Sequence, residues 1–140
     1  MRHRRRIALV AAGALLGAAC GSSTSGAEQV PADSSPEEVA DAFVSARNDG
    51  DVDTQVELAT SKHAEFLRAA SDLDAARLED AERQDVTEPE PGLVNGQDYD
   101  QAVSVGYRYT APDGGRLIWR IFLVRADSGQ PWSVADEGAP

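Results

Sequence analysis

Residues 101–125 read QAVSVGYRYTAPDGGRLIWRIFLVR, two runs of alternating side chains on either side of a turn. Alternation of apolar and polar residues with a period of two is typical of a half-buried β-strand. The connecting segment APDGG at 111–115 has the composition of a hairpin turn. One face of the first run carries Val103, Val105, Tyr107 and Tyr109. The sequence therefore predicts an antiparallel hairpin with this face against the core.

The second run, residues 116–125, is apolar on nearly both faces. One face carries Leu117, Trp119, Ile121 and Leu123. The other carries Ile118, Phe122 and Val124 beside Arg116, Arg120 and Arg125. A strand that is apolar on both faces is typically central in its sheet. We expect Trp119 and Leu123 to be buried between the sheet and the helices.

Weaker strand signals flank this hairpin. Pro89 and Pro91 forbid a helix and disfavour a central strand, so residues 86–95 form at best an edge strand. Trp132 and Val134 indicate a last short strand. The charged residues 79–83 are predicted to be solvated.

Helices are predicted ahead of the strands. The segment SPEE at 35–38 combines a capping serine, a proline at the first helical position and a glutamate that completes a capping box. Gly50 is suited to the end of this helix. Asp51 or Asp53 can cap a second helix. A third helical pattern runs from residue 62 to residue 78, with a bend expected at residues 71–72.

Helices followed by an antiparallel meander predict an α+β domain, with the helices packed on one face of a curved sheet of about four strands. The segments SPEEVADAF at 35–43, NDGD at 48–51 and WSV at 132–134 resemble small bacterial lipoproteins of a domain-of-unknown-function family. The resemblance covers roughly residues 35–136. It implies the cystatin-like cone of the nuclear transport factor 2-like superfamily. That superfamily includes isomerases, dehydratases, cyclases, transport factors and binding modules, so fold alone does not give activity.

The N-terminal segment has the pattern of a signal peptide. Four arginines within the first six residues precede an uncharged apolar run, Ile7–Ala19, which at 13 residues is short for a transmembrane helix. The sequence LGAAC at 16–20 resembles the bacterial lipobox, whose cysteine receives a diacylglycerol; Gly17 stands where that motif usually has leucine. The alternative is an ordinary signal peptide with an incidental cysteine. We therefore predict a signal peptide at 1–19, a lipidated Cys20 and tether at 20–34, and the cystatin-like domain at 35–137.

The net charge of the chain limits its partners and the way in which it can attach to a membrane. Removing the four arginines of the signal peptide changes the formal net charge from −11 to −15. A chain this acidic is repelled by nucleic acid and by anionic headgroups, so we expect no nucleic-acid partner. Two acyl chains on Cys20 suffice for stable anchoring, which predicts a palmitate-type lipid anchor at the extracytoplasmic face of the cell membrane. Arginine outnumbers lysine 12 to 1, as in a high-GC genome such as that of an actinobacterium.

The sequence predicts no catalytic, cofactor or metal site. His63 is the only histidine beyond the signal peptide, and its place at the start of a helix beside Lys62 predicts an exposed side chain. Asp49, Asp51 and Asp53 have a spacing like that of a calcium loop, but Thr60 stands where such a loop needs glutamate. Helix capping is the better interpretation of these aspartates.

The resemblance raises one catalytic alternative. In isomerase-type members an aspartate and a tyrosine that face the interior of the cone carry out the chemistry. Here Tyr99, Tyr107 or Tyr109 could supply the phenol, and Asp98 or Asp100 the base. The alternation of Tyr107 and Tyr109 with valines is what a packed sheet face needs, so we expect core packing.

We therefore expect a non-catalytic binding or assembly module of the cell envelope. Its candidate partner surface, for an envelope protein or a second copy of the chain, is formed by Arg116, Ile118, Arg120, Phe122 and Val124. The alternative interpretation of these arginines is cross-strand pairing with acidic neighbours. Two other functions remain open: a carrier of a small apolar ligand or lipid, which needs an apolar cavity without convergent polar groups, and an isomerase- or cyclase-like enzyme, which needs a buried aspartate beside a buried tyrosine.

Overall fold

The computed structural model describes residues 30–71 and 77–140. The predicted signal peptide, Cys20 and most of the predicted tether lie outside the described residues. In the described part of the chain three helices precede five strands. The helices are α1 (Pro36–Asp49), α2 (Val52–Leu58) and α3 (Ser61–Ala69), and the strands are β1 (Glu79–Val86), β2 (Glu90–Val94), β3 (Gln97–Thr110), β4 (Arg116–Arg125) and β5 (Ser133–Gly138).

The predicted signals at the helix ends are confirmed. The Ser35 hydroxyl accepts a hydrogen bond from the Glu38 N–H, and the Glu38 carboxylate accepts one from the Ser35 N–H at 2.8 Å, which completes the capping box. Gly50 ends α1 with φ +71°, in the left-handed region that favours glycine. Asp51 then caps α2 by accepting hydrogen bonds from the N–H and the hydroxyl of Thr54.

The strands form one antiparallel sheet in the order β1-β3-β4-β5, with β2 also paired to β3. The predicted hairpin is β3–β4, in which Val105 opposes Ile121 and Tyr107 opposes Trp119. β1 and β2 pair with successive halves of β3 along the edge that faces away from β4. The segment predicted as an edge strand therefore does contribute one, β2, at the edge.

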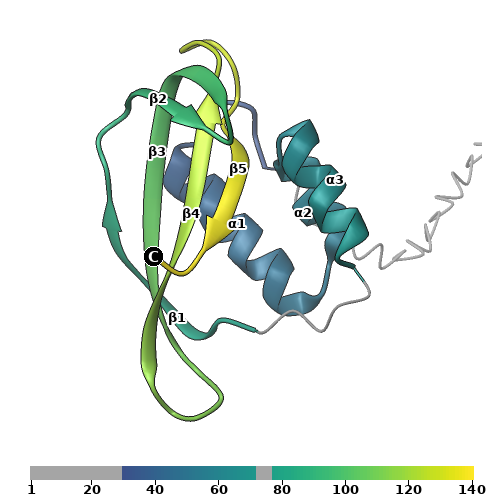
Figure 1. The fold of residues 1–140 in the computed structure, drawn as a ribbon, viewed down its shortest axis with the longest axis vertical. Coiled ribbons are helices and arrows are strands. Elements are labelled where there is room, and N and C mark those ends of the chain that lie inside the picture. The colour runs from purple at the N-terminus through teal and green to yellow at the C-terminus, as the bar shows by residue number, and fades with distance from the viewer. Residues whose placement is uncertain (1–29, 72–76) are drawn as a thin grey trace, which may run out of the picture.

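The three helices cover one face of this sheet (Figure 1). Phe43 of α1 is fully buried against the sheet, together with Val105, Ile121 and Leu123. The predicted burial of Leu123 is confirmed, whereas Trp119 is only partly buried at the border of the core. None of the helices in the described ranges is long and apolar enough to cross a membrane.

The number of strands differs from the expectation. Residues 79–83 are mostly exposed, as predicted, but they belong to strand β1, so the sheet has five strands where about four were expected. β1 lies at an edge with mostly exposed side chains, so backbone pairing holds it and no apolar alternation marks it in the sequence. The third helix ends at Ala69, and the predicted bend and most of the predicted continuation to residue 78 fall at residues 72–76, outside the described residues. Leu78 is buried ahead of β1, where the Asn48 side chain accepts a hydrogen bond from its N–H and donates one to its carbonyl.

Candidate functional site

A pocket of about 450 Å³ opens between the helices and the last two strands. This volume lies within the range of small-molecule sites. Its lining comes from every nearby element: Arg47 and Gly50 at the end of α1, Val52 and Gln55 of α2, Phe66 and Leu67 of α3, Trp119 of β4 and Glu137 of β5, with Ala70, Ser71 and Arg77 at its border with the connection to β1. The wall is therefore mixed, with apolar side chains around a few polar ones.

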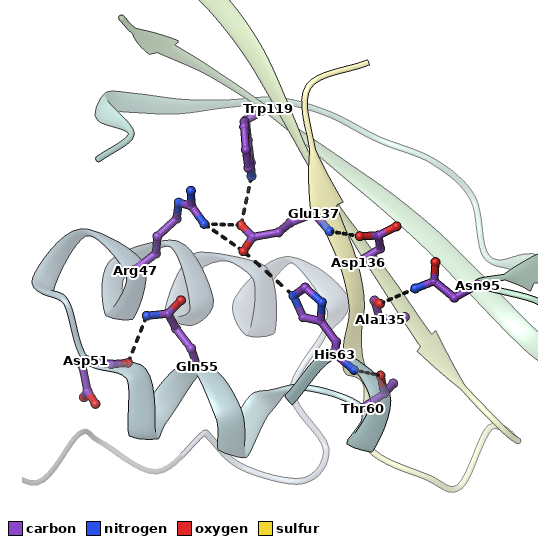
Figure 2. Close-up of polar contacts among 10 residues, drawn as sticks. All are labelled: Arg47, Asp51, Gln55, Thr60, His63, Asn95, Trp119, Ala135, Asp136 and Glu137. Carbon is purple, nitrogen blue, oxygen red and sulfur yellow. Dashed lines mark hydrogen bonds and ion pairs between the residues drawn. The ribbon is translucent and has the colours of Figure 1, made fainter. Parts of the chain in front are cut away.

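The polar part of the wall is an ion pair between Arg47 and Glu137. Nη1 of Arg47 donates to both carboxylate oxygens of Glu137, at 2.8 and 2.7 Å, and the side chains are only 10% and 5% exposed. The indole N–H of Trp119 donates to Glu137 at 3.1 Å, and the Arg47 guanidinium lies 4.8 Å from the centre of the Trp119 ring. Figure 2 shows the three side chains converging from α1, β4 and β5. Trp119 thus holds both members of the pair.

His63 lies behind this pair and is buried, with 5% exposure, so the prediction of an exposed side chain is wrong. The reason is tertiary: the Thr60 N–H donates to the Val134 carbonyl of β5 at 2.8 Å, which docks the start of α3 on the sheet and turns His63 inward. Its ring lies between Phe43 and Phe66, at centroid distances of 6.1 and 5.8 Å.

The His63 imidazole makes no hydrogen bond through Nε2 within the described residues, and this atom lies 3.9 Å from Oε1 of Glu137. Burial lowers the pKa of His63, Asp136 opposes that shift and Arg47 adds to it. The imidazole is therefore held neutral at pH 7.

Burial shifts the pKa of Glu137 in the opposite direction. It raises the pKa of the carboxyl, while Arg47 and the Trp119 hydrogen bond oppose that shift. Gln55, also buried, is fixed by a hydrogen bond from its amide nitrogen to the Asp51 carbonyl at 3.2 Å. The polar groups of the pocket are thus held in place before any ligand arrives.

The five residues of the predicted partner surface lie in different environments. Arg120 pairs with Asp85 of β1 at 2.9 Å, and Arg116 pairs with Glu82 of β1 at 3.4 Å. These two arginines therefore pair with acidic residues of another strand, which is the alternative interpretation given for them above. Ile118 and Phe122 are half-buried on the same strand, whereas Val124 is only 1% exposed and is not available to a partner.

The predicted catalytic alternatives do not assemble as expected. Asp98 and Asp100 are exposed at the end of β3 that pairs with β2, away from Tyr107 and Tyr109 in the core. The Tyr107 hydroxyl instead donates to Asp41 of α1 at 2.6 Å, a pair not predicted from the sequence. Burial, reinforced by Asp41, raises the pKa of Tyr107 far above its usual value, so its hydroxyl stays protonated.

The other two tyrosines have structural positions. Tyr109 contacts the Trp119 ring edge-on at 6.4 Å, within the buried cluster of the core. Tyr99 is half-buried at the start of β3. No cluster of three or more potential metal ligands occurs among residues 30–71 and 77–140.

Sequence reasoning did not find Arg47 or Glu137. They lie 90 positions apart, and nothing in the local pattern distinguishes them from the other charged residues of their segments. Comparison with protein-family models, with curated proteins and with solved structures found no match for this chain.

Proposed function

We propose that this chain is a non-catalytic binding module of the cell envelope, anchored to the membrane through a lipidated Cys20, and that the pocket beside Arg47 and Glu137 is its binding site. The observation that carries the proposal is a preformed pocket of about 450 Å³ with an apolar rim and fixed polar side chains in its wall. Preformed pockets of this kind are the usual form of small-molecule sites. We further propose that the helices and the sheet form the cystatin-like cone expected from the sequence.

The chemistry of the wall favours binding over catalysis. Both oxygens of Glu137 already accept hydrogen bonds from Arg47, and one also accepts from Trp119, so the carboxylate is poorly placed to take a proton from a substrate. His63 lies behind the pair and does not line the pocket. The tyrosine–aspartate pair Tyr107–Asp41 does not line this pocket, and the Asp41 side chain is 51% exposed.

The same wall argues against a carrier of wholly apolar molecules. An acyl chain in this pocket would cover the polar atoms of Arg47 and Gln55 without offering either a hydrogen bond, which is costly. A ligand with one polar group and an apolar body matches the pocket better.

The proposal is tested by filling the pocket. Ala70 lines it, whereas the adjacent Ala69 is exposed and does not, so Ala70→Trp and Ala69→Trp form a matched pair. The protein is extracted from its own membrane and its mass measured under native conditions. We expect wild type and Ala69→Trp to retain a small-molecule adduct and Ala70→Trp to lose it. Equal retention in both variants, at equal protein levels, contradicts a binding role for this pocket.

A further inference from the structure

We propose that this pocket selects a small amphipathic anion, which places an apolar body against Phe66 and Leu67 and an anionic head, such as a carboxylate, at Arg47. This inference rests on the proposed binding function and adds the chemical class of the ligand. Three independent features of the pocket lead to it: its unused hydrogen-bonding groups, its charge and its rim.

The unused hydrogen-bonding capacity is mainly on the donor side. The Glu137 carboxylate already accepts three hydrogen bonds, two from Arg47 and one from Trp119. Arg47 makes these bonds through Nη1 alone, and neither Nε nor Nη2 has a hydrogen-bond partner within the described ranges. Of these two nitrogens Nε is enclosed by protein atoms, so Nη2 is the one we expect to donate to a ligand in the pocket that Arg47 lines. Figure 2 shows this end of the guanidinium turned away from Glu137.

The lining charges favour the same class of ligand. Among the described residues of the lining, Arg47 and Arg77 are positively charged and Glu137 is negatively charged, in a chain of formal charge −11. Glu137 already neutralises part of the Arg47 charge. The pocket should therefore attract a ligand with one anionic group, and the negative charge of Glu137 disfavours a second one. Hydrogen bonds from a guanidinium to an anion are stronger than those to a neutral acceptor.

The rim defines the body of the ligand. Phe66 is 61% exposed although it is aromatic, and its ring stacks on His63 with an interplanar angle of 17°. Leu67 and Val52 continue this apolar surface into the pocket. Covering Phe66 with a ring or a branched chain would remove apolar surface from water, which is favourable.

The test uses Trp119 as the reporter. The full chain is placed in phosphatidylcholine nanodiscs with Trp132→Phe, which leaves Trp119 as the only tryptophan. Quenching of its fluorescence is titrated with 4-bromobenzoate and with 4-bromobenzamide, which match in shape and differ in charge. We expect saturable quenching by both, with half-saturation by the benzoate at about a tenfold lower concentration.

Two further variants test whether the preference for the benzoate depends on the buried charges of the pocket. Arg47→Met with Glu137→Met removes both buried charges together and should abolish the preference for the benzoate. Arg125→Met removes a guanidinium that lies over Trp132, outside the pocket, and should keep the preference. Equal half-saturation for the two probes overturns the anionic class and leaves the binding pocket standing. Absence of saturable quenching by either probe overturns the class and the proposed pocket together.

Discussion

Arg47 in the last turn of α1 and Glu137 in β5 are joined by a buried ion pair, with Nη1 of the arginine 2.7 and 2.8 Å from the two carboxylate oxygens. The arginine also lies at the negative end of the α1 dipole, where a positive charge is favoured. The pair connects the helical layer to the end of the chain and forms the wall of the pocket. Each member is tolerated in the interior because the other is present.

The first prediction follows from this dependence. Glu137→Met leaves the Arg47 charge buried without its partner and should lower the free energy of unfolding by about 3–5 kcal/mol. Arg47→Met with Glu137→Met removes both charges and should recover most of that loss. Urea unfolding of wild type, the two single variants and the double variant measures the coupling. Additive losses in the double variant would show that the two side chains stabilise the fold independently.

The second prediction concerns the pH dependence of stability at His63. Its folded pKa is lowered by burial, so as pH falls below about 6.5 the unfolded chain takes up a proton that the folded chain does not. Stability should therefore fall as pH decreases through the range between the usual histidine pKa and the lower folded value, and be fully present above it. Urea midpoints between pH 7.5 and 5 for wild type and His63→Gln measure the effect.

The readout is the difference between these two proteins at each pH. Glu137 lies near His63, and the raised pKa of Glu137 stabilises the fold as pH falls, opposite to His63. These contributions, and that of the Arg47 charge, are present in both proteins. A difference that does not change between pH 7.5 and 5 would mean that His63 is protonated equally in the folded and unfolded chains.

The third prediction compares two phenylalanines. Phe43 is fully buried in the core, whereas Phe66 is 61% exposed at the rim of the pocket. Phe43→Ala should cost about 3–5 kcal/mol of unfolding free energy, because the sheet and helix cannot close the cavity it leaves. Phe66→Ala should cost far less, and the comparison is made by urea unfolding at one pH. Similar losses for the two variants would place Phe66 in the core.

The parts of the fold that were predictable have a signal in neighbouring residues. The β3–β4 hairpin follows from the alternation of residues 101–109, the turn APDGG and the apolar run after it, and the start and end of α1 follow from Ser35, Glu38 and Gly50. Such signals depend on side chains a few positions apart, so the sequence displays them directly.

The parts that were missed depend on distant residues. β1 is held by its pairing with β3 and carries a charged edge, so its composition indicated solvent rather than a strand. His63 is buried because Thr60 docks on Val134, which lies far along the chain. The Arg47–Glu137 pair likewise exists only once β5 is in place, and no local rule predicts a buried charge there.

The last prediction concerns the anchor at Cys20. If the predicted signal peptide is removed, Cys20 is the only cysteine and the formal charge is −15, which disfavours attachment to an anionic surface by charge alone. A diacylglycerol on Cys20 would supply two acyl chains, enough for stable attachment. Cys20→Ala should therefore shift the processed protein to the soluble fraction or leave an uncleaved precursor, and should abolish incorporation of an alkyne-labelled fatty acid. Ser22→Ala, two positions along, is the matched control and should remain labelled and membrane-bound. A Cys20→Ala protein that is cleaved and still sediments with membranes would show that something other than this lipid holds the domain in place.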